Sequence, residues 1–316
     1  MLIEEIVEIK EFRGIKELAE PLSLKKFNVL IGKNNSGKSA LLEALFLFPH
    51  PDRTYQLLPK SWSIKNFIGN RRSGLKSLVY KYEGRTSLKF KAKIEKGIDE
   101  WTITISSKGN SKVFQNNQKV ESSLKFKESL YFPYDTQFIK GLDEFLDENE
   151  EALIKGSIHT KVAKMISAHL DERFTEIVLK KDGWYLRRED ASYIHIDDVG
   201  EGVKKAARIM MVAELLKPKL ILWDDFDTSL HPSMIKMLLK WLAQGDWQVV
   251  IATHSIDVLY YLADLNEELD NFDAQLILLR KDQGDILHHK ELNMDELEDL
   301  LEGNVDPRML VDVLKI

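Results

Sequence analysis

Apolar residues recur along this chain in two patterns, and each pattern predicts a different part of the fold. Short runs that are almost entirely apolar are typical of strands buried on both faces; they occupy residues 27–31, 220–223, 249–252 and 276–279. Stretches with helical spacing follow these runs or separate them; they occupy residues 40–46, 203–216, 233–243 and 256–262. Strands that alternate with helices in this way predict a mostly parallel sheet covered on both faces.

The middle of the chain follows a different pattern. Between about residues 76 and 121, apolar and polar residues alternate, and turns that contain Gly or Asn separate the segments 78–80, 88–94, 101–105 and 112–114. Period-two alternation with such turns predicts an antiparallel meander. Residues 138–175 are rich in Leu, Glu, Lys and Ala at helical spacing and contain no proline, which predicts two or so helices, the first of them acidic.

The composition excludes several classes of protein. With 44% hydrophobic residues, the chain of 316 residues is too apolar to be disordered. It contains no cysteine, which excludes disulfides and thiolate metal sites. The N-terminal segment is charged, and no apolar run approaches the length of a membrane span. We therefore expect a cytoplasmic protein with no membrane partner.

Charge is distributed unevenly along the chain. Residues 60–127 contain 16 Lys and Arg against 5 Asp and Glu, a net charge of +11, whereas the whole chain carries −6. This basic region has three interpretations. It contacts nucleic-acid phosphates, with Tyr80, Tyr82, Phe90 and Trp101 interleaved; it is a solubilising face that protects edge strands; or it docks onto the acidic segment 143–151 of the same or another subunit.

One loop carries the pattern G-x-x-x-x-G-K-[ST] between a predicted strand and a predicted helix. Its glycines let the backbone curl so that N–H groups point at phosphate oxygens, and the N-terminus of the helix adds partial positive charge. The pattern predicts that Lys38 reaches the β- and γ-phosphates of a nucleotide and that the Ser39 hydroxyl holds Mg²⁺. The residues expected to bind the nucleotide here are Gly32, Lys33, Asn34, Asn35, Ser36, Gly37, Lys38, Ser39 and Ala40.

Three further segments carry polar residues where a nucleotide site needs them. Asp224 and Asp225 end one apolar run; we expect Asp224 to hold the metal or a metal-bound water, and Asp225 to orient or deprotonate the attacking water. His254 follows another apolar run, at the edge of a parallel sheet where ligands bind, and is a candidate γ-phosphate contact. A second helix N-terminus suited to an anion is formed by Gly200, Glu201 and Gly202.

In this order, these segments resemble one superfamily, the ABC-type ATPases, and within it the SMC/RecF/OLD-like branch. The phosphate loop and its helix read FNVLIGKNNSGKSALLEAL, DVGEGVK is similar to the signature motif, and WDDFDTSLHP resembles I-D-E-x-E-x-x-L-H-P. IKEFRG at 9–14 looks like the N-terminal I-x-N-F-R strand, and THS at 253–255 looks like the switch histidine. The resemblance covers about residues 1–48 and 195–282.

The resemblance implies a fold and a function. The fold class is α/β: a P-loop NTPase head of the ABC-ATPase type, with a mostly parallel central sheet, an antiparallel β meander and a helical insertion. A homodimer would close around two ATP molecules with Mg²⁺, the signature of each copy capping the other's nucleotide, and Arg13 would lie near the nucleotide. The implied activity is ATP hydrolysis by a nucleotide-driven dimer switch in DNA maintenance or in defence against foreign DNA. The alternative is a weakly hydrolysing scaffold that recruits a separate effector protein.

The resemblance also divides the chain and exposes departures from the family pattern. The four parts are an N-terminal lobe, a basic β region, a helical insertion and a C-terminal lobe, at residues 1–58, 59–127, 128–180 and 181–316. Gly200 replaces the usual signature serine, and Asp225 replaces the usual catalytic glutamate, which predicts slow hydrolysis. Gln56 and Gln137 are the candidates for the glutamine loop. The 62 residues after His254 leave no room for an OLD-type nuclease domain, so we expect any nuclease to be a separate protein.

Overall fold

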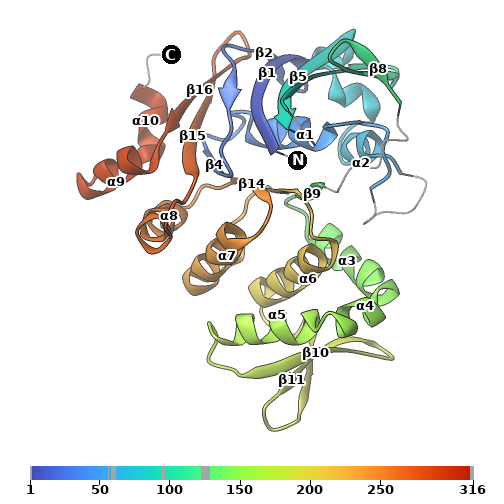
Figure 1. Ribbon diagram of the computed structural model, residues 1–316, viewed down its shortest axis with the longest axis vertical. Coiled ribbons are helices and arrows are strands. Elements are labelled where there is room, and N and C mark those ends of the chain that lie inside the picture. The colour runs from blue at the N-terminus through green and yellow to red at the C-terminus, as the bar shows by residue number, and fades with distance from the viewer. Residues whose placement is uncertain (1, 56, 58–61, 94–96, 122–128, 314–316) are drawn as a thin grey trace.

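A computed structural model describes residues 2–55, 57, 62–93, 97–121 and 129–313. Most of its strands join one mixed sheet, in the order β8-β7-β6-β5-β1-β2-β16-β15-β4-β14-β13-β9, with β3 paired to β1. A small separate sheet, β10-β11-β12, lies at the opposite end of the molecule from β8 (Figure 1). The mixed α/β architecture confirms the predicted fold class.

Five neighbouring strands of the large sheet run parallel and form its centre: β15 (Ala274–Lys281), β4 (Phe27–Ile31), β14 (Gln248–Ala252), β13 (Leu220–Trp223) and β9 (Ser129–Phe132). Their residues are buried almost throughout, as the apolar runs predicted. Helix α1 (Lys38–Leu47) lies on one side of these strands. On the other side lie α6 (Glu201–Leu216), α7 (Pro232–Gln244) and α8 (Ile256–Glu268) (Figure 1).

The rest of the sheet is mainly antiparallel. Its strands are β16 (Ile286–Leu292), β2 (Ile15–Leu18), β1 (Leu2–Phe12), β3 (Leu22–Ser23), β5 (Arg85–Lys93), β6 (Asp99–Ser106), β7 (Ser111–Gln115) and β8 (Gln118–Val120). Buried and partly exposed residues alternate along β5 and β6, as the period-two pattern predicted. Helix α2 (Ile64–Asn70) precedes this meander.

The prediction that residues 78–80 form a strand was wrong. The segment folds into two short 3-10 turns, η1 (Leu75–Leu78) and η2 (Tyr80–Tyr82). Lys81 and Tyr82 have positive φ angles of 51° and 66°, which extended backbone does not allow. An isolated bridge between Val79 and Phe12 joins the segment to β1.

The region that begins with the predicted helical insertion contains a small sheet as well as helices. It contains α3 (Thr136–Glu148), α4 (Glu150–Lys155) and α5 (Ile158–Ser167), followed by β10 (Phe174–Lys180), β11 (Gly183–Arg188), β12 (Tyr193–His195) and η3 (Ile196–Asp198). The acidic segment is bound within this part of the molecule: Asp143 accepts hydrogen bonds of 2.7 Å from Arg208, and Asp147 accepts one of 2.6 Å from the Trp184 indole. Within one chain, these two carboxylates therefore do not bind the basic meander.

Two short helices, α9 (Met294–Glu302) and α10 (Pro307–Val313), lie beyond β16 in the sequence. Among the helices that the structure describes, none is both long enough and apolar enough to cross a membrane.

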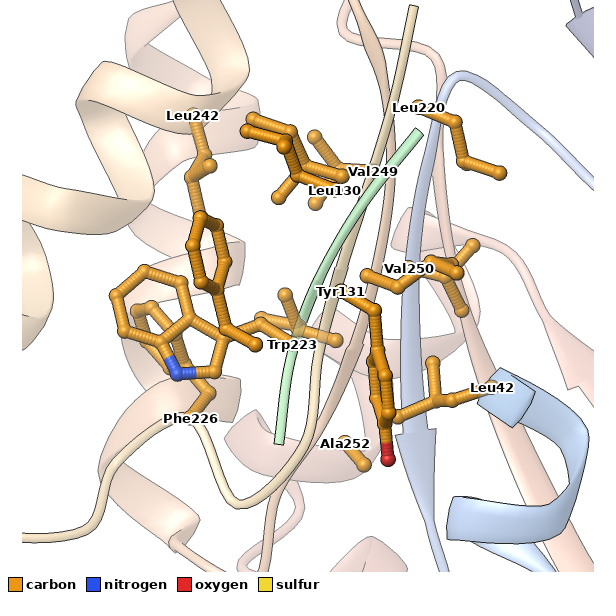
Figure 2. Close-up of a cluster of buried hydrophobic side chains, with 14 of the residues drawn as sticks. Leu42, Leu130, Tyr131, Leu220, Trp223, Phe226, Leu242, Val249, Val250 and Ala252 are labelled. Carbon is orange, nitrogen blue, oxygen red and sulfur yellow. The ribbon is translucent and has the colours of Figure 1, made fainter. Parts of the chain in front are cut away.

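The hydrophobic core on both faces of the parallel strands holds the ends of β4 and β13 in place. Leu42 and Tyr131 pack on the side of α1, whereas Trp223, Phe226 and Leu242 pack on the other side (Figure 2). The rings of Trp223 and Phe226 meet edge to face, 4.9 Å apart. Burying each of these side chains contributes roughly 1.5–3 kcal/mol, so the loops that follow both strands start from a rigid base.

Amide side chains form a polar network at the amino ends of the parallel strands. Asn28 of β4 donates to the Val249 carbonyl at 3.0 Å and accepts a bond of 2.9 Å from Gln275 of β15. Gln248 of β14 exchanges two hydrogen bonds with the backbone of Ile3, at 2.8 and 2.9 Å. All three amides are buried, and the network lies at the opposite ends of the strands from the phosphate loop.

Candidate functional site

The phosphate loop joins β4 to α1, and two of its glycines are required by the backbone. A Cβ atom at Gly32 would lie 2.5 Å from the Leu279 carbonyl oxygen and 2.5 Å from Ser36 Oγ. Gly37 has a φ of 103°, in the region that favours glycine. The loop therefore curls tightly between the end of the strand and the first turn of the helix.

Lys38 folds back onto this loop. Its Nζ donates to the carbonyls of Gly32 at 2.9 Å and Lys33 at 3.2 Å, and only 6% of the residue is exposed. Burial lowers the pKa of the ammonium, an effect that the nearby Asp225 and Asp224 oppose. An anion in the loop would give Lys38 a stronger partner than two neutral carbonyls.

Ser36 supplies an independent sign that the loop fits a phosphate. Its hydroxyl is buried and has no hydrogen-bond partner within the part of the chain that the structure describes. Buried polar atoms are normally paired, so an unpaired hydroxyl in a curled phosphate loop fits a ligand oxygen.

Ser39 and Asp224, the two predicted magnesium ligands, lie together. The Ser39 hydroxyl hydrogen-bonds to the Asp224 carboxylate, and the Asp224 N–H donates to the Phe132 carbonyl of β9 at 2.9 Å. Burial, with Asp225 nearby, raises the pKa of Asp224, while Ser39 and Lys38 oppose the shift. The described residues contain no cluster of three or more His, Asp or Glu side chains suited to a metal. This donor set fits Mg²⁺, which is commonly held by one or two protein groups and by substrate phosphates.

Asp225 and His254 line the same cavity as the phosphate loop, a space of about 850 Å³. Asp225 adopts a φ of 45°, and Phe226 N–H next to it donates to the Ala252 carbonyl at 2.9 Å. The His254 side chain is exposed, and its carbonyl accepts a bond of 2.9 Å from Arg308 of α10. The fold thus brings three segments, far apart in the sequence, to one cavity.

Arg13 lies at the wall of this cavity, but its guanidinium binds protein groups. Nε donates to Glu43 at 2.6 Å, Nη1 donates to the Ser77 hydroxyl at 2.8 Å, and Nη2 donates to the Ile68 carbonyl at 3.2 Å. Glu43 is buried, and burial raises the pKa of its carboxyl against the opposing effect of Arg13. Arg13 therefore links β1 to α1 and to the segment before β5.

The predicted signature residues lie elsewhere. Among the described residues that line the 850 Å³ cavity, none belongs to 200–202. Gly200 caps the N-terminus of α6, and Glu201 lines a second cavity of about 410 Å³. A Cβ atom at Gly202 would lie 2.6 Å from the Ser229 carbonyl oxygen, so the start of α6 packs closely on the loop that follows β13.

Sequence reasoning missed part of the cavity wall. Arg72 and Lys81 line it, together with a cluster in which Tyr80 donates to Asp285 at 2.8 Å and Lys281 forms a 2.8 Å ion pair with Asp285. The basic excess of residues 60–127 indicated that cations gather here, but only the fold shows that they face the phosphate loop. Of the two candidates for the glutamine loop, Gln56 lies outside the described residues and Gln137 belongs to α3.

Comparisons with known proteins place the chain among its relatives. Residues 81–259 match the family described as "AAA domain, putative AbiEii toxin, Type IV TA system", and residues 1–122 match an AAA ATPase domain family. Two uncharacterized proteins of Methanocaldococcus jannaschii are similar in sequence. MJECL11 is 28% identical over 33% of this chain and 95% of its own length; MJECL10 is 45% identical over 18% of this chain and 25% of its own length.

Solved structures show the same fold at low sequence identity. An SMC head bound to the C-winged helix domain of ScpA matches with a TM-score of 0.68 and 14% identity, over 93% of this chain and 99% of that chain. The SMC head domain from Thermotoga maritima gives 0.58 and 10%, over 93% and 100%. The recombination mediator protein RecF with ATPγS gives 0.52 and 16%, over 91% and 97%. The chain belongs to the first of these AAA-domain families, and its fold is that of SMC head domains and RecF.

Proposed function

We propose that this protein binds Mg·ATP in the 850 Å³ cavity and hydrolyses it slowly. One observation carries the proposal: the phosphate loop, Asp225 and His254 line one cavity. Beside it, the Ser39 hydroxyl hydrogen-bonds to the Asp224 carboxylate. The unpaired Ser36 hydroxyl and the enclosed Lys38 ammonium support a phosphate ligand in the loop.

Each residue has a distinct part in this mechanism. Lys38 and the loop N–H groups would bind the phosphates, and Ser39 and Asp224 would hold Mg²⁺, whose charge would offset that of the phosphates. Asp225 orients the attacking water and accepts its proton, and His254 contacts the γ-phosphate. The Asp225 side chain is one methylene shorter than the usual glutamate, so it holds the water more loosely and hydrolysis is slow.

The proposal extends to a homodimer that ATP closes. Because residues 200–202 do not line the cavity of their own chain, they are available to cap a nucleotide held by a second copy. Gly200 lacks a hydroxyl, so this contact uses backbone N–H groups at the start of α6. Opening of the dimer then follows hydrolysis.

DNA maintenance, or defence against foreign DNA, is the setting that we propose. It is supported by the likeness to RecF, a recombination mediator, and to SMC heads. If the basic region binds nucleic acid, two lysines on its strands are poorly suited to contact phosphates. Lys89 already pairs with Glu8 at 3.2 Å, and Lys91 pairs with Glu5 at 2.6 Å. The exposed cations near the cavity mouth, Arg72, Lys76 and Lys81, are the better candidates for a phosphate backbone.

A second function is a scaffold that binds ATP, hydrolyses it little, and recruits a separate effector protein through the closed dimer. The shorter carboxylate at Asp225 favours it, and the SMC head bound to ScpA is an example of a head with a separate partner. Steady-state turnover separates the two functions.

The test combines turnover, nucleotide affinity and light scattering with and without ATP. Lys38→Ala should lose tight binding; unchanged affinity would show that the phosphate site lies elsewhere. Asp225→Asn should bind ATP, lose turnover and accumulate dimer, and Asp225→Glu should raise turnover. If Asp225→Asn hydrolyses ATP as fast as the wild type, Asp225 is not the base.

A further inference from the structure

Lys205 of α6 holds the loop that carries Asp225. Its Nζ donates to the carbonyls of Phe226 at 3.1 Å, Thr228 at 3.1 Å and Asp225 at 3.4 Å. The ammonium also lies 5.1 Å from the centre of the Trp223 ring. A single cation thus binds three of the four carbonyls between residues 225 and 228.

This loop needs such a constraint at Asp225. The residue has a φ of 45°, a conformation that a non-glycine residue adopts only at a cost. The far side of the loop is tied to β14, because Phe226 N–H donates to Ala252 and the Thr253 hydroxyl donates to Asp227. On the side of α6, the hydrogen bonds from Lys205 hold the loop.

We propose that Lys205 is a positioning residue for ATP hydrolysis, which fixes the Asp225 loop and joins it to the helix that begins at Gly200. This inference rests on the proposed function. Residues 200–202 lie within two turns of Lys205 on the same helix, so a shift of α6 when residues 200–202 engage a second copy's nucleotide would move the Asp225 loop. Each site of the dimer would thereby sense whether the other is filled.

The charge of Lys205 gives the proposal a distinctive readout. Burial lowers the pKa of its ammonium to about 8, although Asp227 and Asp225 oppose the shift. Other charged groups line the second cavity together with Lys205: Asp135 just before α3, Lys140 of α3, Asp197 of η3, and Glu201, Lys204 and Arg208 of α6. Deprotonation would remove the charge that attracts three carbonyls, so turnover should fall as the pH rises through this value.

The experiment measures kcat, KM and ATP affinity of the full chain between pH 6.5 and pH 10. Lys205→Met should lower kcat about tenfold to a hundredfold, as for a misplaced catalytic group, and change the ATP Kd less than about threefold. Lys205→Arg should keep most of the turnover at pH 7 and lose the decline near pH 8, because guanidinium stays charged. Lys161→Met is the matched control, since Lys161 pairs with Glu214 on the far part of α6.

Each outcome is decisive. Turnover of Lys205→Met equal to that of the control, or an alkaline decline that persists unchanged in Lys205→Arg, overturns the inference while the proposed function stands. If Lys205→Met fails to fold, the pH profile of Lys205→Arg alone decides. Absence of turnover in the wild type overturns hydrolysis as the proposed function, and this inference with it.

Discussion

Replacing Arg13 tests whether this residue binds nucleotide, as the sequence predicted, or supports the fold, as its contacts indicate. Arg13→Met would leave Glu43 buried without the cation that now lies 2.6 Å away, and the side chains of this pair are only 9% and 4% exposed. Breaking a buried ion pair from one side costs about 3–5 kcal/mol. For a chain of this size, that cost corresponds to a fall of roughly 6–10 °C in Tm.

The pH dependence follows from the carboxyl group. Burial raises the pKa of Glu43 above its ordinary value, so the folded state favours the neutral form more than the unfolded chain does, and the stability that this shift contributes is lost as the pH rises through the raised pKa. Arg13 opposes this shift, so its removal raises the pKa further. The destabilisation by Arg13→Met should therefore be larger at pH 8 than at pH 5.

The assay compares wild type and Arg13→Met. Urea and thermal unfolding at pH 5 and pH 8 measure stability, and ATP titration at pH 7.5 measures nucleotide affinity. In a Glu43→Gln background, Arg13→Met should cost less, because no carboxylate remains without its cation. The ATP Kd should change less than about threefold once the protein is folded. If Arg13→Met unfolds like the wild type but loses ATP affinity more than tenfold, the guanidinium binds nucleotide and our interpretation is wrong.

Three other predictions concern the loops and surfaces near the site. Gly202→Ala should lower the free energy of unfolding by about 1–3 kcal/mol, because its Cβ would clash with the Ser229 carbonyl. Gly200→Ala is the control: no atom lies within 4 Å of the added Cβ, so Tm should stay unchanged. Equal shifts in Tm for the two variants would refute the packing argument. Nucleotide affinity should fall as the pH rises. Burial lowers the pKa of Lys38 in the protein without nucleotide, and bound phosphates should raise it again. Calorimetry in buffers of different ionisation enthalpy should therefore show that protons are taken up when the nucleotide binds. If the protein binds nucleic acid, charge reversal near the cavity mouth should flatten the dependence of affinity on salt more than charge reversal on β5, and equal slopes would contradict this. The two sets are Arg72, Lys76 and Lys81, and Lys89, Lys91 and Lys93.

Local pattern was enough to predict the elements whose environment is uniform along their length. The strands at 27–31, 220–223 and 249–252 are buried on both faces, so composition alone identifies them. Composition could not identify residues 78–80, where an apolar run forms 3-10 turns because the chain must bend around the cavity wall. It also missed β9, a strand of only four residues whose burial depends on pairing with β13.

The candidate site also has a part that local pattern predicts and a part that it does not. The phosphate loop is contiguous, so the spacing of its residues was enough to predict it. Asp224 and Asp225 directly follow one buried strand, and His254 comes shortly after another. Contacts that join distant segments had no local signal: Lys205 on the carbonyls after β13 is separated from them by 20 or more residues. Likewise, the family resemblance implied that Arg13 lies near the nucleotide, and no pattern near it shows that Glu43, 30 residues away, binds it.

The buried amides of Asn28, Gln248 and Gln275 bear on how accurately the site is assembled. Apart from these amides, β4 and β14 carry buried apolar side chains on both faces, so a shift of one residue between them would exchange one apolar side chain for another at little hydrophobic cost. The same shift would break the hydrogen bonds from Asn28 to the Val249 carbonyl and from Gln248 to the Lys25 carbonyl, and each buried group left unpaired costs about 1–3 kcal/mol. It would also move Gly32 by about 3.3 Å along the strand relative to Asp224. That distance exceeds the 2.0–2.1 Å of a typical magnesium–oxygen bond, so the register that these amides favour at one end of the sheet bears on the proposed magnesium site at the other.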